Sequence, residues 1–271
     1  MPDVDDDPQS GDRTNSHGTS PGRGGGQRQL VGLSLPLVSS SRRQLARQIS
    51  ELIERPRTEA VKASRPQVIG ITGPPGAGKS TLVDQMIRAL RRADQRPGVI
   101  LVDPSSPLTG GALLGDRIRM QEHSSDEHVF IRSLATRGRL GGLADGIDGV
   151  LGLLGEGGFA PLLIETVGVG QSEVEVAQIA DTVVLVLYPG WGDEVQTAKA
   201  GLLEVADIFF VNKADQGDAG PLIGQIEAML ALSSRDWKPP VIGGSALTGV
   251  GIEALLSAIS AHVNYLADAD R

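Results

Sequence analysis

The sequence predicts an α/β fold in which a mostly parallel central sheet is flanked by helices. From Pro66 onward, short apolar runs alternate with stretches whose apolar residues recur at helical spacing, which is typical of a parallel sheet with helical crossovers. The 271 residues provide length for one large domain with a buried core. Polar residues follow directly on several apolar runs, at the sheet edge where such folds bind their ligands. These residues are Asp103, Glu165, Asn212 and Ser245.

The composition excludes several kinds of partner and site. A formal net charge of −8 and a pI near 5.1 argue against nucleic acid or an anionic membrane as the main partner. Because cysteine is absent, the chain has neither disulfides nor thiolate metal sites, and a cytoplasmic location is expected. No apolar run approaches the ~20 residues that would span a bilayer.

The chain begins with a segment that we expect to be disordered. It is rich in Asp, Gly, Ser, Pro and Arg and has almost no bulky apolar residues, so burial cannot offset its conformational entropy. A helix follows, with Leu45, Ile49 and Leu52 on one face, and it ends before Pro56. The predicted division is a disordered tail over 1–30, a helical segment over 31–65, the α/β domain over 66–265 and a short tail over 266–271.

Runs rich in Val, Ile and Leu predict the strands. The first run, 68–71, directly precedes a glycine-rich loop, and the second, 98–102, ends at Asp103. The other predicted strands are 129–133, 161–164 before Glu165, 182–187, 208–211 before Asn212, and one near Val241.

Helices are predicted between these runs, where apolar residues recur every three or four positions. The first begins near Leu82, directly after the glycine-rich loop, and a later one is interrupted by several glycines. The predicted helices after the first are 113–122, 140–154, 173–179, 195–204, 222–232 and 252–263.

The glycine-rich loop has the spacing of a phosphate-binding loop, so the domain is predicted to have the P-loop NTPase fold. Glycines let the backbone wrap closely around phosphate oxygens, and successive amide N–H groups then form a concave anion site at a helix N-terminus. In this pattern Lys79 bridges the outer phosphates and the Ser80 hydroxyl ligates magnesium. The alternative is a glycine-rich turn with an incidental lysine. The predicted contacts are Gly73, Pro74, Pro75, Gly76, Ala77, Gly78, Lys79, Ser80 and Thr81.

A second motif, Asn212-Lys213-Ala214-Asp215, predicts that the bound base is guanine. The Asp215 carboxylate can accept from both N1–H and the exocyclic amine of guanine, whereas adenine would leave it unpaired. Asn212 would brace the loop, and the stem of Lys213 would cover the base. The next strand is followed by Ser245, Ala246 and Leu247, whose backbone amides suit the guanine carbonyl oxygen.

Acidic residues at neighbouring strand ends are candidates for the magnesium site and for hydrolysis. Glu165 ends a strand near the predicted metal, and the amide of Gly168 would face the γ-phosphate. Asp103 could contact magnesium through water or orient the attacking water. Asp116 is a third candidate ligand, with a solvated helix residue as the alternative. The four histidines show no metal-ligand spacing, and surface or satisfied positions are expected for them.

Several longer segments occur in a fixed order along the chain. They are Asp103-Pro104-Ser105-Ser106-Pro107, Thr109-Gly110-Gly111, Leu114-Gly115-Asp116-Arg117, Arg137-Gly138, the run from Glu165 to Glu173, and the run from Pro189 through Asp215. This string resembles the MeaB/ArgK family, over roughly residues 40 to 260.

The resemblance implies a Mg²⁺-dependent GTPase that assists a cobalamin-dependent acyl-CoA mutase, typically methylmalonyl-CoA mutase. Family proteins are thought to gate the loading of intact adenosylcobalamin and the expulsion of damaged cofactor. The implied roles place Lys79 and Ser80 at phosphate and magnesium, and Asp103 and Glu165 at the metal and the hydrolytic water. Asp116 lies in a motif associated with magnesium. The implied mutase-sensing segment is 190–199, with Asp193, Glu194 and Lys199 as coupling residues, where the residues alone suggest a solvated helix N-terminus.

The chain departs from the family pattern at both ends. The family usually carries a C-terminal helical extension that mediates dimerisation, which this sequence lacks after its last core helix, so the usual homodimer is in question. The N-terminal tail is unlike the helical start of the family.

Three other functions are compatible with parts of the sequence. A metal-insertion GTPase for hydrogenase or urease shares the nucleotide core, but the chain lacks cysteines and a histidine-rich tract. A kinase would transfer the phosphate of GTP to a small molecule or transport protein. A scaffold would bind the nucleotide without turning it over.

Overall fold

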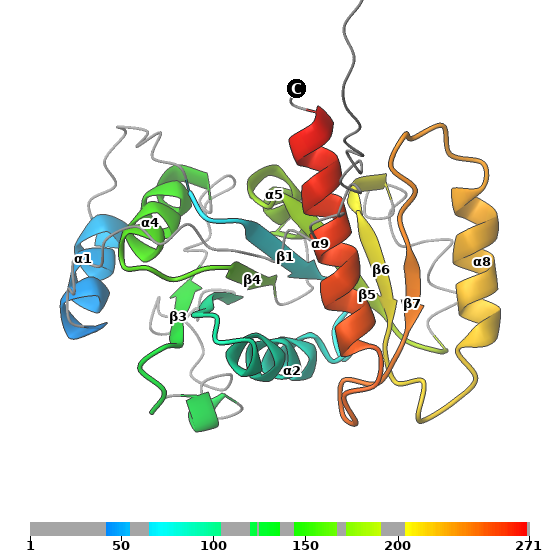
Figure 1. The fold of residues 1–271 in the computed structure, drawn as a ribbon, viewed down its shortest axis with the longest axis horizontal. Helices are drawn as coiled ribbons and strands as arrows, with labels where there is room; N and C mark the ends of the chain where they lie inside the picture. Colours follow the sequence, from blue (N-terminus) through cyan, green and yellow to red (C-terminus); the bar gives the residue numbers. More distant parts are fainter. Residues whose placement is uncertain are drawn as a thin grey trace, which may run out of the picture. The chain divides into compact units, whose positions relative to one another are not determined.

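The computed structural model describes residues 42–54, 65–103, 120–123, 125–135, 144–166, 172–190 and 204–269. All of them belong to one compact unit, Gly32–Arg271. Its seven strands form one sheet in the order β3-β2-β4-β1-β5-β6-β7, and every pairing is parallel (Figure 1). The predicted α/β fold with a parallel sheet is therefore confirmed.

All seven predicted strands are present, with ends that differ by a residue or two. Strands β1, β4, β5 and β6 are buried at every position, which explains why the sequence shows continuous apolar runs rather than alternation. The strands are β1 (Val68–Thr72), β2 (Gly98–Asp103), β3 (Phe130–Ala135), β4 (Leu162–Thr166), β5 (Thr182–Leu187), β6 (Ile208–Val211) and β7 (Val241–Gly243).

The described helices also follow the prediction, with one correction near the C-terminus. The last helix was expected to end at 263 and be followed by a tail over 266–271, but it continues to Ala269. Tyr265 gives its final turns a packing partner, since its ring centroid lies 5.2 Å from that of Trp237. The helices are α1 (Arg42–Glu54), α2 (Lys79–Arg92), α4 (Ala144–Glu156), α5 (Ser172–Ile179), α8 (Gly220–Leu230) and α9 (Ile252–Ala269).

Two predicted helices, 113–122 and 195–204, lie almost entirely outside the described residues. The end of the first is a short 3₁₀ helix, η1 (Gln121–His123). Among the described helices, none has the length and apolar character to cross a bilayer.

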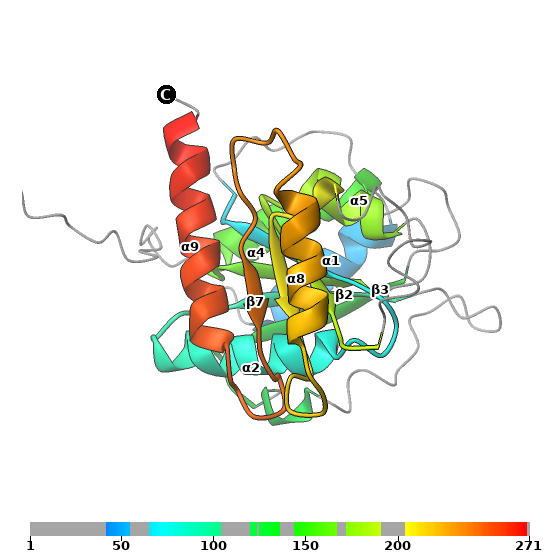
Figure 2. The ribbon, with the colours of Figure 1, turned by 90° about the vertical axis from the view of Figure 1, so that its right-hand side faces the viewer.

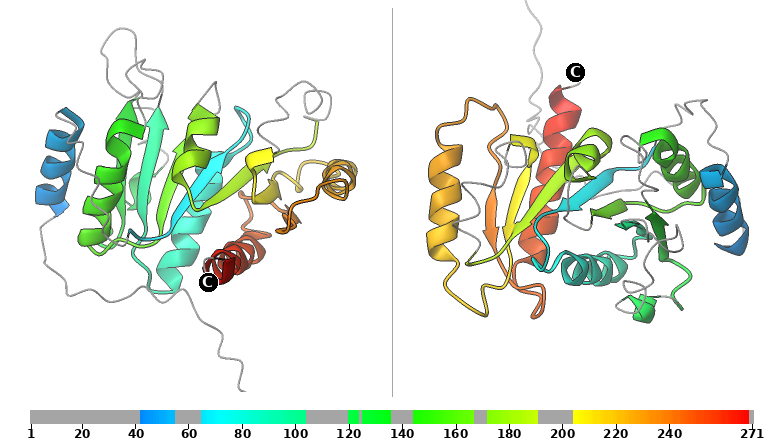
Figure 3. Two further views of the ribbon diagram at one scale, coloured as in Figure 1. Left: turned by 90° about the horizontal axis from the view of Figure 1, so that it is seen from above. Right: turned by 180° about the vertical axis from the view of Figure 1, so that it is seen from behind.

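Helices cover both faces of the sheet (Figures 1 and 3). Helices α2 and α9 pack on one face, where Leu82 and Leu255 share a core cluster with Ile69 of β1. On the other face α4 packs with Val150 against Ile100 of β2, and α1 lies on α4. Helix α8 covers that face near β5 and β6, so α8 and α9 flank β7 from opposite sides (Figure 2). Strands β1, β4, β5 and β6 are thus held between packed layers along their whole length.

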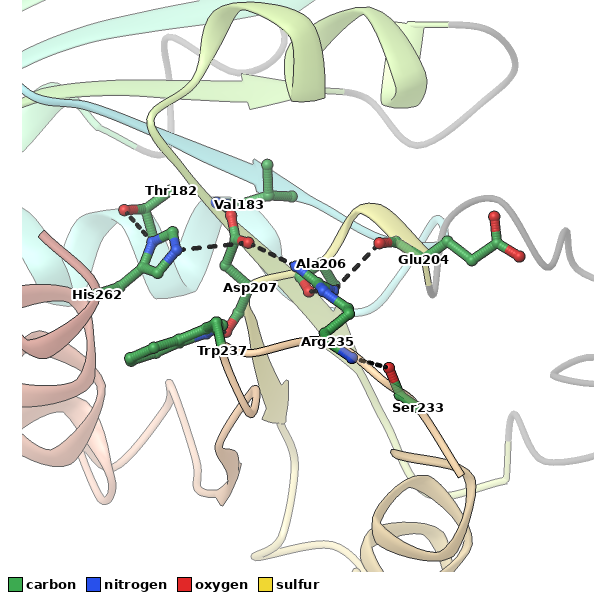
Figure 4. A network of polar contacts seen from close by, with 9 residues as sticks. All are labelled: Thr182, Val183, Glu204, Ala206, Asp207, Ser233, Arg235, Trp237 and His262. Atoms are coloured by element: carbon green, nitrogen blue, oxygen red, sulfur yellow. Dashed lines mark hydrogen bonds and ion pairs between the residues drawn. The ribbon is translucent and has the colours of Figure 1, made fainter. Parts of the chain in front are cut away.

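A partly buried polar network around Asp207 closes the amino edge of β5 and β6 (Figure 4). Its carboxylate accepts from the Val183 amide at 2.9 Å and from Arg235 Nη2 at 3.0 Å. His262 of α9 is 3% exposed, and its Nδ1 lies 2.9 Å from Thr182 Oγ1. Burial of the imidazole lowers the pKa of His262 below its ordinary value of 6.5, although Asp207 opposes the shift. This network fastens α9 to the sheet at the edge opposite the phosphate loop.

Acidification through about pH 6.5 should lower the free energy of unfolding. The unfolded chain takes up a proton at the ordinary pKa of histidine, whereas folded His262 takes it up only at a lower pH. The stabilisation is therefore complete above about pH 6.5 and is lost as the pH falls below that value. Denaturant unfolding of wild type and His262→Gln should give a stability difference that is largest near pH 8 and shrinks toward about pH 5. A difference that stays constant with pH would contradict this assignment.

Candidate functional site

The phosphate loop lies at the carboxyl end of the central strand. Strand β1 ends at Thr72 and α2 begins at Lys79, so residues 73–78 connect them. Strand β1 lies between β4 and β5, and the chain leaves the adjacent strands β1 and β4 in opposite directions, from β1 to β2 and from β4 to β5. This is the kind of position at which parallel sheets bind ligands.

The loop conformation depends on glycine. The φ angles of Gly73, Gly76 and Gly78 are 141°, 73° and 88°, a region that other residues rarely adopt. A Cβ at Gly78 would lie 2.4 Å from Asn212 Nδ2, and one at Gly73 would lie 2.1 Å from the Val186 carbonyl oxygen. Glycine therefore supplies both the turn and the close approach to strands β5 and β6.

Lys79 begins α2 and is 6% exposed. Its ammonium donates to the carbonyl oxygens of Gly73 and Pro74, at 2.8 Å and 2.9 Å. The side chain therefore arches back over the loop that it follows. A cation held there faces the place where the motif would hold phosphate.

Ser80 joins the phosphate loop to β4. Its hydroxyl donates to Glu165 Oε1 at 2.6 Å, and Glu165 pairs in register with Ile71 of β1. Hydroxyl and carboxylate oxygens are the hard ligands that Mg²⁺ prefers, and Mg²⁺ commonly adds phosphate oxygens and water to one or two protein ligands. The donor set formed by Ser80 and Glu165 therefore fits magnesium.

Asp103 is the last residue of β2, whose partner β4 carries Glu165. Its backbone thus reaches the same sheet edge. The other predicted residues for metal and γ-phosphate, Asp116 and Gly168, lie outside the described residues, as do Asp193, Glu194 and Lys199.

Asn212 connects the phosphate loop to the predicted base-binding loops. It directly follows β6 and is 3% exposed. Its Nδ2 donates to the Ala77 carbonyl oxygen at 2.7 Å, and its Oδ1 accepts from the Ala246 amide at 2.8 Å. One amide side chain therefore spans three loops, as expected of a residue that braces the site.

The remaining predicted base contacts lie in two adjoining loops. Lys213 has a left-handed backbone, with φ 62°, and the Ala214 amide donates to the Gly244 carbonyl oxygen at 3.0 Å. Asp215 is exposed, so its carboxylate is accessible to a ligand. The side chain of Leu247 is also exposed, an unusual position for a large apolar residue. The structure thus brings Asn212, Lys213, Asp215, Ser245, Ala246 and Leu247 to one corner of the sheet edge.

Polar contacts fasten the segment after residue 120 to α2. His123 Nε2 lies 2.8 Å from Asp84 Oδ1, and Arg91 Nε lies 2.8 Å from Asp126 Oδ2. The hydrogen bond from Arg91 holds the pKa of the Asp126 carboxyl below its ordinary value, and the His128 amide adds to the effect. Within the described residues, neither this loop nor any other part contains a group of three or more side chains suited to a metal ion.

Sequence reasoning missed Tyr188. This residue directly follows β5, and the Lys213 ammonium lies 4.5 Å from its ring centroid. The signal that could have identified it was an aromatic residue at a strand end in a chain with only two tyrosines.

Comparisons with known proteins identify a matching family model and similar chains. The family model described as "Methylmalonyl Co-A mutase-associated GTPase MeaB" matches residues 32–271. A solved structure described as an LAO/AO transport system kinase has a TM-score of 0.65 and 30% identity, covering 84% of this chain and 73% of that one.

Two relatives illustrate the range of similarity. A protein of Pyrococcus horikoshii is 52% identical over 209 residues, which are 75% of this chain and 66% of the relative. The mouse methylmalonic aciduria type A homolog, mitochondrial, is 39% identical over 241 residues, which are 84% of this chain and 58% of the relative. The chain therefore spans about two thirds or less of the length of these relatives.

The contact between Gly78 and Asn212 predicts the effect of adding one methyl group. In Gly78→Ala the new Cβ would meet Asn212 Nδ2 and strain a left-handed backbone, so GDP affinity should fall at least about tenfold. Gly76→Ala is the matched control, because its backbone is also left-handed but its Cβ would meet nothing within 4 Å. Calorimetric titration with GDP should show a smaller loss for Gly76→Ala. Equal losses would mean that the contact with Asn212 is unimportant.

Proposed function

This chain belongs to the MeaB family of methylmalonyl Co-A mutase-associated GTPases, and from that premise we propose that it is a Mg²⁺-dependent GTPase serving a cobalamin-dependent acyl-CoA mutase. The proposed output is a conformational change that couples GTP hydrolysis to loading or protection of the mutase cofactor. The observation that carries the nucleotide part is the double hydrogen bond of Asn212, which joins a phosphate loop to a loop suited to guanine.

Guanine recognition is assigned to Asp215. Its carboxylate accepts from N1–H and the exocyclic amine, while Ser245, Ala246 and Leu247 present backbone amides and an apolar edge to the base. The phosphates lie in the loop from Gly73 to Thr81. The cost of leaving Asp215 unpaired disfavours adenine.

Hydrolysis is assigned to positioning and electrostatics, because phosphoryl transfer requires little covalent chemistry from the protein. Lys79 would neutralise charge on the outer phosphates, and Ser80 with Glu165 would hold the metal, which when bound would supply further neutralisation of the phosphate charge. Asp103 and Asp116 complete the proposed acidic set. The Gly168 amide would contact the γ-phosphate, and loss of that phosphate after hydrolysis would release the loop that contains Gly168.

The mutase is proposed from the family rather than from the geometry. The description of the family model names a mutase-associated GTPase, and the name of the mouse relative refers to methylmalonic aciduria. Asp193, Glu194 and Lys199 are the proposed coupling residues toward the mutase. We also propose that the protein is cytoplasmic and that it can form a homodimer.

Asp215→Asn should change the preferred base from guanine to xanthine. The amide offers one donor and one acceptor, which match the C2 carbonyl and N1–H of xanthine but not the two donors of guanine. GDP affinity should fall about 10- to 100-fold while xanthosine diphosphate affinity rises. Competition binding with both nucleotides would measure this. Unchanged preference for GDP would contradict the role of Asp215.

The mutase assignment is tested by affinity capture from native cell extract with the protein loaded with a non-hydrolysable GTP analogue. We expect a cobalamin-dependent acyl-CoA mutase to be retained with the analogue and less so without nucleotide. Lys79→Ala, which should lose nucleotide binding, is the control. Retention of no mutase would contradict the proposal, and stoichiometric tight nickel binding in equilibrium dialysis would instead support metal insertion.

Hydrolysis is tested separately with GTP labelled at the γ-phosphate. Free phosphate is the expected product, and its formation should accelerate when the mutase is added. Label transferred to a small-molecule or protein acceptor would indicate a kinase. Turnover that stays undetectable with the mutase present would indicate a scaffold.

A further inference from the structure

Tyr188 and Lys213 meet across two neighbouring strand ends. Tyr188 follows β5 and Lys213 comes two residues after β6, and these strands pair in register at Leu187 and Val211. The backbone N–H of Asn212 donates to the Leu187 carbonyl oxygen at 2.8 Å, and this hydrogen bond holds the two backbones side by side. The Lys213 ammonium lies 4.5 Å from the centroid of the Tyr188 ring, within the range of a cation–π interaction.

We propose that Tyr188 is a positioning residue for nucleotide binding, which holds the Lys213 ammonium so that the lysine stem stands as one wall of the guanine pocket. This inference rests on the proposed guanine-binding role of the loop that begins at Asn212. Tyr188 itself lies outside the phosphate-binding and base-reading motifs.

The ring can hold the lysine because the ring itself is held. Tyr188 is partly buried and packs against two core clusters, one containing Val186 and Phe210 and the other containing Leu187 and Val211. A free lysine side chain loses considerable conformational entropy when a ligand orders it. Tyr188 orders part of that chain before the nucleotide arrives, so less of the binding free energy is lost.

The loop backbone around Lys213 is fixed by other contacts. Its left-handed conformation is accompanied by hydrogen bonds from the Ala214 amide to Gly244 and from the Gln216 amide to Lys213 itself, at 3.0 Å and 2.9 Å. A change at Tyr188 should therefore release the lysine side chain without unfolding the loop.

The ammonium of Lys213 contacts the Tyr188 ring and, among the ion pairs of the described residues, forms none with the carboxylate of Asp215. An ammonium bound to Asp215 would compete with the two donors of guanine for the same oxygens. Holding Lys213 over Tyr188 leaves Asp215 accessible to the base.

The test compares Tyr188→Phe with Tyr188→Leu by stopped-flow binding of fluorescent GDP. Phenylalanine keeps the aromatic face and should stay within about twofold of wild type. Leucine keeps an apolar side chain but has no aromatic face, so GDP affinity should fall about three- to tenfold, chiefly through faster dissociation. In a Lys213→Met background, Tyr188→Leu should change affinity less than about twofold, because the cation is gone.

The results distinguish a failure of the role of Tyr188 from a failure of the guanine site. Wild-type affinity in Tyr188→Leu, or the same loss in the wild-type and Lys213→Met backgrounds, would overturn the positioning role. Wild type that binds ADP as tightly as GDP would instead overturn the guanine site itself. If Tyr188→Leu fails to fold, Lys213→Arg and Lys213→Met are compared with Tyr188 intact. Arginine, which keeps a cation for the ring, should bind GDP more tightly than methionine, and equal affinities would overturn the proposal.

Discussion

The two hydrogen bonds of the Asn212 side chain are the constraint on which the site depends. They join the loop after β1 to the loop after β7, through a residue at the end of β6. The amide is buried, so losing either partner would leave a polar group without compensation at a cost of about 1–3 kcal/mol. The same contact leaves no room for a side chain at Gly78. The hydrogen bonds of Asn212 therefore both stabilise the loops and preorganise them for a nucleotide.

The two edges of the sheet have different tasks. At the amino edge, Asp207, Arg235 and His262 form a network that fastens α9 to the beginning of β5 and β6 (Figure 4). At the carboxyl edge, Lys79 and Asp215 present charges that a nucleotide can use. The carboxyl edge therefore carries the candidate site, and the amino edge anchors the last helix.

Much of the fold could be predicted because its signals are local. Buried parallel strands give continuous apolar runs. The residue spacing within the phosphate loop and the Asn212 motif is specific to a small number of nucleotide-binding structures. The continuation of α9 to Ala269 and the pairing of Tyr188 with Lys213 could not be predicted, because each depends on contacts between residues far apart in the chain. The hydrogen bond from Ser80 to Glu165 could be predicted from the sequence, because both residues are predicted to bind the same magnesium ion.

If Asn212 joins the phosphate loop to the base loops, all of these loops should respond to a guanine nucleotide as one unit. Amide hydrogen exchange of the wild-type protein would be measured with GDP and Mg²⁺ and, in parallel, with ADP and Mg²⁺. GDP should slow exchange together in residues 73–81, 212–217 and 244–248, and ADP at the same concentration should slow it much less. Slowing confined to 73–81, and equal for the two nucleotides, would contradict a guanine site joined through Asn212.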